Sequence, residues 1–315
     1  MPKLFQNKVF QDPAAAREWL EAMLWPQGPL CGHCGSQNEA KALASRPGVY
    51  QCNACRKQFT VTVGTVFERS HIPLNKWLLA TFLFCASKKG VSAHQMHRLL
   101  GLTYKSAWFM MHRLREAVTP GSDAGPLGGP GKIVEADETY LLKVSGKKKH
   151  AGAGGWGHKM KVLALVERGG DIRSMRIKNA TSHEIGTRLR ENVDPASTLH
   201  TDGANHYKFM HGVAGHEAVD HNKQYVRKGK DGVKVHTNTL EGYFSVFKRG
   251  LVGTYQHIGE QHLDRYLAEF DFRQNNRAAV GVDDEARAVK AIAGIVGKRL
   301  TYRQTNAANN AKTEG

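Results

Sequence analysis

The sequence predicts a multidomain α/β protein, in which a cysteine-rich module and a helical segment precede a mixed α/β domain. Three observations lead to this architecture. Two Cys-x-x-Cys pairs stand near the N-terminus, helical periodicity dominates the stretch that follows, and short β-forming runs begin after a segment rich in Gly and Pro. At 315 residues the chain exceeds the usual size of one domain.

The charge of the chain indicates the class of its partner. Lys and Arg number 45 against 28 Asp and Glu, for a formal net charge of +17. A surplus of this size favours a polyanion, because each phosphate contact releases counterions, and nucleic acid is the leading candidate. The sequence has no apolar run of about 18 residues and no signal-peptide pattern. We therefore expect a cytoplasmic protein with no membrane partner.

The cysteine pairs predict one structural zinc ion. Each pair places two thiolates on a tight turn, and the 17 residues between the pairs allow a hairpin that closes a tetrahedral four-sulfur site. The expected ligands are Cys31, Cys34, Cys52 and Cys55. Such a site leaves no coordination position open for catalysis. We expect His33 to face solvent and Cys85, in an apolar run, to be a buried small hydrophobe.

Helical stretches at 74–88 and 92–117 predict a helix-turn-helix segment. Ser92 is an N-capping residue and Gly101 breaks the second stretch, as in DNA-binding motifs of this kind. An ordinary helical hairpin has the same caps and periodicity and remains the alternative. The expected packing face of the second helix comprises Ala107, Met110, Met111 and Leu114. The candidate DNA contacts are Tyr104, Lys105, Ser106 and Arg113.

The pattern changes to β-forming runs after the Gly- and Pro-rich segment. Three runs, a helix and a fourth run predict a mixed α/β domain, which two further helices complete. The expected strands are Ile133–Tyr140, Val162–Glu167, Ile172–Ile177 and Thr198–Asp202, and the expected helices are 182–193, 236–249 and 260–275. The last dozen residues have the composition of a disordered tail.

Three acids in this domain form a candidate two-metal site. Asp137 lies within a β-forming run, Asp202 at a strand end and Glu241 on a helix. Each acid alone has an ordinary explanation as a turn or solvated residue, but the order strand, strand, helix favours a site. Three carboxylates around two Mg²⁺ or Mn²⁺ ions suit in-line attack on a phosphodiester. Lys248 follows Glu241 by seven residues and shares its helix face, where it would bind phosphate.

Other polar residues near these acids are candidates for supporting roles. Glu135 shares a strand face with Asp137 and is a candidate auxiliary acid. Asn238 and His236 are candidate contacts to the metal site or to DNA. A basic, Gly-rich loop follows the first strand and is either a DNA clamp or a solvated hairpin tip. The further candidate DNA contacts are Lys147, Lys148 and Lys149 in this loop, and Lys248 and Arg249 on the helix.

Over nearly the whole chain, these motifs resemble bacterial insertion-sequence transposases related to the Merlin superfamily, the ISXO2-like group. The resemblance is carried by the cysteine ribbon and the segments Glu135–Tyr140, His200–Gly203, His236–Gly242 and Lys248–Gly250. It implies a ribonuclease-H-like catalytic fold. It also implies a DDE triad with Asp137 on the first strand, Asp202 on the fourth and Glu241 on the following helix.

The identity of the third residue of the triad is left open by the resemblance. Some members of this group have Asn there, and Asn238 lies one turn from Glu241. We favour Glu241 because of its carboxylate and its spacing to Lys248. The expected domain boundaries are an N-terminal helix at 1–27, a zinc ribbon at 28–63, the helix-turn-helix segment at 64–118, a linker at 119–132, the catalytic domain at 133–280 and a C-terminal extension at 281–315.

The function implied by the resemblance is DNA transposition. Such a protein would bind element ends and target double-stranded DNA, cleave with water, and join the freed 3′-hydroxyl to the target. We expect a homo-oligomer, at least a dimer on DNA. One alternative is a DNA-binding regulator that has lost catalysis, which the presence of all three acids disfavours. The other is a ribonuclease-H-like nuclease without strand transfer, which gives no reason for both a ribbon and a helix-turn-helix.

Overall fold

The computed structural model describes residues 7–121, 124–144, 158–207, 212–221, 223–229 and 232–301. The chain divides into two compact units, which are described separately. Unit 1 comprises 1–87, 91–118 and 284–315, and unit 2 comprises 88–90 and 119–283. Every helix within the described ranges is too short or too polar to span a bilayer.

Unit 1 begins with two helices and a small antiparallel sheet. Helix α1 (Lys8–Gln11) is followed by α2 (Pro13–Leu24), which starts where predicted because the Asp12 carboxylate accepts hydrogen bonds from two backbone amides and Pro13 occupies the first turn. Strands β1 (Ala40–Ala42), β2 (Tyr50–Cys52) and β3 (Gln58–Phe59) form the sheet in that order. Its apolar core is small, which is typical of a module that depends on metal.

The helical part of unit 1 has the helices and the turn that the sequence predicts for this segment. Helices α3 (Leu74–Ala86), α4 (Ala93–Leu100) and α5 (Tyr104–Val118) follow the ribbon. The Ser92 hydroxyl caps α4 by accepting from the Gln95 amide, and Gly101 ends α4 at φ 61°, a left-handed conformation that favours glycine. The predicted packing face of α5 is buried throughout, at Ala107, Met110, Met111 and Leu114.

The end of the chain folds back onto unit 1. Helix α9 (Asp284–Ala293) packs against α3 and α5. The Arg287 guanidinium donates to the Cys85 carbonyl at 3.0 Å, and the Val66 amide donates to the Ile295 carbonyl at 3.1 Å. Cys85 is buried, as predicted. From the sequence we expect 281–315 to be a C-terminal extension, whereas in the structure residues 284–301 are part of this folded unit. The expected disordered tail lies outside the described residues.

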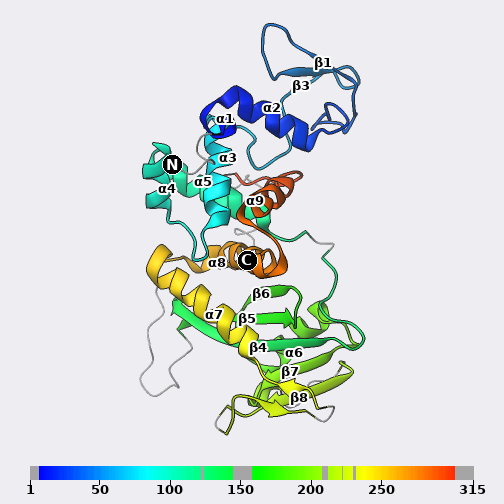
Figure 1. Cartoon of the computed structure of the whole chain (residues 1–315), viewed down its shortest axis with the longest axis vertical. Coiled ribbons are helices and arrows are strands. Elements are labelled where there is room, and N and C mark those ends of the chain that lie inside the picture. Colours follow the sequence, from blue (N-terminus) through cyan, green and yellow to red (C-terminus); the bar gives the residue numbers. More distant parts are fainter. Residues whose placement is uncertain are drawn as a thin grey trace, which may run out of the picture. The chain divides into compact units, whose positions relative to one another are not determined.

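Unit 2 is built on a mixed five-stranded sheet (Figure 1, green arrows). Its strands, in the spatial order β6-β5-β4-β7-β8, are β4 (Ile133–Lys143), β5 (Lys159–Glu167), β6 (Ile172–Ile177), β7 (Thr198–Asp202) and β8 (Gly215–Val219). Strand β5 runs antiparallel to both β4 and β6, whereas β7 is parallel to β4 and β8 is parallel to β7. This topology agrees with the expected ribonuclease-H-like fold.

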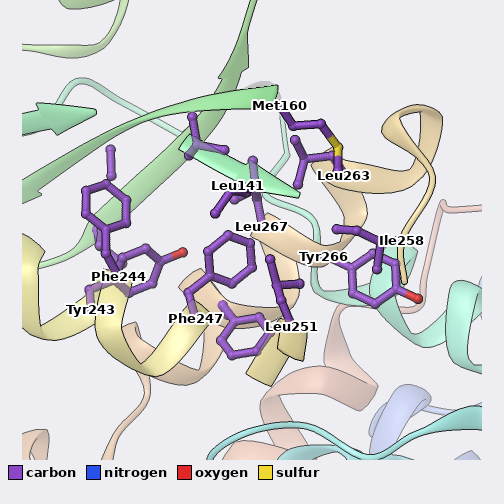
Figure 2. Packing of buried hydrophobic residues seen from close by; sticks show 14 of the residues in the cluster. Leu141, Met160, Tyr243, Phe244, Phe247, Leu251, Ile258, Leu263, Tyr266 and Leu267 are labelled. Atoms are coloured by element: carbon purple, nitrogen blue, oxygen red, sulfur yellow. The ribbon is translucent and has the colours of Figure 1, made fainter. Parts of the chain in front are cut away.

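Helices cover both faces of the sheet. Helix α6 (Ser182–Asn192) packs on one face, and α7 (Asn238–Gly250) and α8 (Leu263–Asn275) pack on the other. Strand β5 is buried on both sides because alternate residues point to opposite faces: Val162 joins the α7–α8 core and Leu163 the α6 core. Figure 2 shows aromatic side chains of α7 packed against the sheet and α8.

Side chains of α8 satisfy the outer edge of the sheet. Asn275 accepts from the Ile172 amide at 2.8 Å and donates to the Ile172 carbonyl at 3.0 Å. Asp271 accepts from the Ser174 amide at 2.7 Å. Because an edge strand otherwise presents unpaired backbone groups, α8 closes this side of β6.

The sequence analysis missed the shortest elements. Strand β8 and the two-stranded ribbon of β9 (Arg227–Lys228) and β10 (Lys234–Val235) were not predicted, because they are short or mix polar residues without alternation. The remaining short helical segments are the 3-10 helices η2 (Asn205–Tyr207), η4 (Glu260–His262) and η5 (Ala278–Val280) and the π-helix η3 (Leu251–Tyr255).

Candidate functional site

The four cysteines of unit 1 form a sulfur cage. The Sγ atoms of Cys31 and Cys55 lie 3.8 Å apart and those of Cys34 and Cys52 lie 3.7 Å apart, and all four fall within 4.8 Å of one another. A tetrahedron with Zn–S bonds of about 2.3 Å has edges of about 3.8 Å. A disulfide would instead bring two sulfurs to about 2.05 Å. The donor set and its spacing therefore fit one structural Zn²⁺.

Matching turns position the two cysteine pairs. Gly35 and Arg56, which follow the second cysteine of each pair, adopt left-handed backbones at φ 77° and 61°. Their amides donate to the carbonyls of Cys31 and Cys52 at 2.9 and 3.0 Å. His33 is exposed, with its Nε2 atom 3.2 Å from the Gln58 carbonyl oxygen and outside the sulfur cluster. It faces solvent, as expected.

The candidate catalytic acids meet on the sheet face under α7. Ala136 pairs with Thr201 in the parallel ladder of β4 and β7, so the next residues, Asp137 and Asp202, are neighbours on one face. Burial, together with the nearby carboxylates of Glu138, Asp202 and Glu241, raises the pKa of Asp137 to about 8. Burial also raises the pKa of Asp202.

These acids are less tightly gathered than the cysteines. In the described part of the chain, the sulfur cage is the one group of three or more potential ligand atoms that all lie within 4.8 Å of one another.

Helix α7 brings Glu241 close enough to Asp137 to affect its pKa. The apolar side chains of this helix, among them Leu240, Tyr243 and Phe247, are buried, whereas Glu241 is exposed beside them. The Glu241 carboxylate is 42% exposed and lies 3.3 Å from Nδ1 of His221. Asn238, the alternative third residue, is exposed at the first position of α7. Lys248 and Arg249 are exposed in its last turn.

Glu135 anchors the start of α7. Its fully buried carboxylate accepts from Nε and Nη2 of Arg168 at 3.0 and 2.9 Å. It also accepts from the amide and hydroxyl of Thr239 at 3.1 and 3.0 Å, and lies 3.3 Å from Nδ1 of His236. The first amides of a helix lack internal partners, so Glu135 caps α7 from a neighbouring strand. This contact fixes the turn that precedes Glu241.

The sequence analysis missed the role of Glu138, which pairs with a histidine and a tyrosine. Glu138 follows Asp137 on β4, so its side chain points to the opposite face. There it accepts from the Tyr207 hydroxyl at 2.8 Å and pairs with Nε2 of His206 at 2.9 Å. The hydrogen bond to Glu138 raises the pKa of His206. The available signal was that Asp137 and Glu138 are adjacent in one strand. Successive side chains of a strand point to opposite faces, so the two acids had to have different partners.

The candidate DNA contacts at the start of α5 lie on the surface of the helix-turn-helix. The Tyr104 side chain is 44% exposed and stacks on His94 with ring centroids 4.2 Å apart. Lys105 is also exposed. The Ser106 hydroxyl hydrogen-bonds to that of Thr103 at 2.9 Å, as part of the cap of α5.

The other basic candidates differ in position. The Arg113 guanidinium donates to the Glu68 carbonyl at 2.9 Å and lies over the Phe109 ring, and burial lowers its pKa. Arg113 is thus engaged within unit 1. The candidates Lys147, Lys148 and Lys149 lie outside the described residues.

Comparison with known proteins links both units to transposases. Residues 126–275 match the ISXO2-like transposase domain, and residues 11–58 match the transposase zinc-ribbon domain. The chain is also 27% identical over 285 residues to an uncharacterized protein in transposable element ISH50 of Halobacterium salinarum, an alignment covering 85% of this chain and 92% of that relative. The chain is therefore similar to transposases in two segments, a zinc-ribbon domain at 11–58 and an ISXO2-like transposase domain at 126–275.

Proposed function

We propose that this protein is an insertion-sequence transposase that cleaves and joins DNA with two divalent ions held by Asp137, Asp202 and Glu241. The observation that carries this proposal is the proximity of three carboxylates, because Asp137 and Asp202 are neighbours on one sheet face and Glu241 of α7 is close enough to raise the pKa of Asp137. Carboxylate oxygens are the ligands that Mg²⁺ and Mn²⁺ prefer. When bound, such a pair of ions activates the attacking oxygen and stabilises the leaving oxygen of a phosphodiester.

The surrounding residues would hold this site in place. Glu135 fixes the first turn of α7, and His221 orients the Glu241 carboxylate through a 3.3 Å contact. Lys248 lies two turns further along α7 and is exposed, where it would position a DNA phosphate. Together these contacts would keep the third acid near the two aspartates while the substrate changes.

Recognition of the element ends is assigned to unit 1. Tyr104 and Lys105 stand at the start of α5, where the recognition helix of a helix-turn-helix meets base edges, and Ser106 adjoins them. Arg249 and the basic loop after β4 would add sequence-independent phosphate contacts. Because strand transfer acts on two element ends, the active assembly is proposed to be at least a dimer on DNA.

The experiment that tests the catalytic proposal separates cutting from binding. Asp137→Asn, Asp202→Asn and Glu241→Gln should each abolish cleavage of a duplex containing an element end in Mg²⁺ or Mn²⁺, because a neutral amide ligates these ions poorly. Gel-shift affinity for the same duplex should persist. Asp264→Asn is the control, because this carboxylate is 64% exposed on α8 and belongs to no part of the proposed site.

Two outcomes would change the assignment. If Glu241→Gln cuts normally whereas Asn238→Ala is inactive, Asn238 is the third active-site residue. If all three acid variants cut as well as the native protein, the two-metal site is wrong.

The reaction products distinguish the competing functions. An inactive regulator would bind the end duplex and leave it uncut, and a nuclease without strand transfer would cut it but join nothing to a target plasmid. We expect joined products, since segments similar to the transposase zinc ribbon and to the ISXO2-like transposase domain occur in one chain.

A further inference from the structure

We propose that unit 2 binds an unpaired DNA nucleotide beside the acid site, through Tyr225 and the exposed lysines Lys228 and Lys234 of the ribbon that follows it. The inference rests on the proposed function, because it assigns the place of one nucleotide next to the phosphodiester that is cut. It adds a base-stacking contact that neither the helix-turn-helix nor the three acids supply.

Tyr225 lies one side chain away from the proposed catalytic site. Its side chain is 67% exposed, unusually open for a large aromatic ring. The ring packs edge-on against His221, with centroids 5.5 Å apart and an interplanar angle of 77°. The same imidazole lies 3.3 Å from the Glu241 carboxylate. A nucleotide whose phosphate reached the acids would therefore have an aromatic face within reach of its base.

The ribbon that follows Tyr225 carries an unfavourable pair of like charges. Lys228 of β9 and Lys234 of β10 are directly opposite each other in the antiparallel register, and both are exposed. Like charges in this position destabilise a strand pair. A phosphate group between the two ammonium groups would reverse that cost. This observation is independent of Tyr225 and also points to a polyanionic strand.

The chemistry of Tyr225 and the two lysines favours an unpaired nucleotide over a continuous duplex. Each base has a π face that can stack on tyrosine, but inside a duplex both faces are already covered by neighbouring bases. Enzymes that act on a nucleotide commonly take it out of the stack for this reason. Val226 and Val233 are also exposed in this segment, but the two opposed lysines favour a polyanion over a protein partner. The strand leaving the acid site is thus expected to place one base on Tyr225.

The test measures binding of single-stranded DNA by the full, zinc-loaded chain without added Mg²⁺ or Mn²⁺, where no cleavage is expected. The probe is fluorescein-labelled oligothymidine, with a random duplex of the same length for comparison. Tyr225→Ala should lower single-strand affinity about 5- to 150-fold, since stacking contributes about 1–3 kcal/mol per base. Tyr225→Phe should retain native affinity because it keeps the ring. Duplex affinity should change less than twofold in both variants.

Charge and matched-control variants complete the design. Lys228→Gln and Lys234→Gln should each reduce the salt dependence of single-strand binding by about 0.7 in the logarithmic slope. Val252→Ala removes an equally exposed apolar side chain of unit 2, 68% exposed, and should bind like the native protein.

The proposal is overturned if Tyr225→Ala keeps native single-strand affinity, or if Tyr225→Phe loses as much as Tyr225→Ala. This binding measurement needs no Mg²⁺ or Mn²⁺. A negative result for the nucleotide proposal is therefore independent of a negative result in the cleavage test.

Discussion

The buried carboxyl of Asp271 makes the stability of unit 2 depend on pH. It accepts from the Tyr243 hydroxyl at 2.6 Å and from the Ser174 amide at 2.7 Å, where α8 meets the edge of the sheet. Despite these donors, burial raises its pKa from 3.8 to about 6. The native state therefore binds this proton more tightly than the unfolded chain does.

The sign and size of the effect follow from linkage. Because the folded pKa is raised, the contribution of Asp271 to stability is fully present below about pH 4 and is lost as the pH rises through about 6. A shift of about two pKa units corresponds to about 3 kcal/mol. The free energy of unfolding should therefore contain a term that falls by about 3 kcal/mol between pH 4 and pH 7.

The assay compares native protein with Asp271→Asn, whose amide has nearly the same shape but does not titrate. The urea-induced unfolding of unit 2 would be measured from pH 4 to pH 8, with hydrogen exchange of the β6 peptide Ile172–Ile177 as the signal. The difference between the two proteins isolates the carboxyl, since every other titrating group is common to both. Asp264→Asn, an exposed carboxylate on the same helix, should show no such trend.

A difference in unfolding free energy that stays constant across the pH range, or that has the opposite slope, would contradict a raised pKa at Asp271. A constant offset alone would mean that the amide replaces a hydrogen bond poorly. It would leave no evidence for a raised pKa at Asp271.

Three further predictions concern the metal, the anchor of α7 and the phosphate contact. Cys52→Ser should lose the single zinc per chain in metal analysis, whereas Cys85→Ser, also buried but outside the sulfur cage, should retain it; full zinc in the first variant would contradict the site. Glu135→Ala should destabilise unit 2 by about 3–5 kcal/mol in urea unfolding, because it leaves the Arg168 guanidinium without its carboxylate partner. Glu135→Gln should recover part of that loss. Native stability in both variants would show that Glu135 is not needed to hold α7. Lys248→Ala should slow cleavage less than Glu241→Gln does, and an equal loss would place Lys248 in the chemistry itself.

Local patterns predicted most of the secondary structure. Strands β6 and β7 have the bounds expected from the sequence, Ile172–Ile177 and Thr198–Asp202, because alternation and turn residues act over a few positions. The cysteine spacing predicted the sulfur cage for a similar reason, since each pair is closed by its own tight turn. Helix α4 likewise begins and ends at residues that cap it locally, Ser92 and Gly101.

Contacts between distant segments required the folded chain. The sequence placed Glu135 on the strand face of Asp137, but whether a carboxylate there binds metal or caps a helix depends on which segments surround it. Thr239 lies 104 positions away in the chain and accounts for two of its hydrogen bonds. The packing of α9 on α3 and α5 also required the folded chain. The apolar side of α9 packs on helices far away in the sequence, which its own pattern does not identify.

Periodicity therefore determines which residues share a face, because φ and ψ preferences repeat along one segment. It does not determine what that face meets, because burial and pairing energies arise between segments far apart in sequence. For this chain, the local patterns predicted the ribbon, the helix-turn-helix and the strands that carry Asp137 and Asp202. The tertiary structure decided that Glu135 caps α7, that Glu138 pairs with His206, and that Tyr225 lies beside Glu241 through His221.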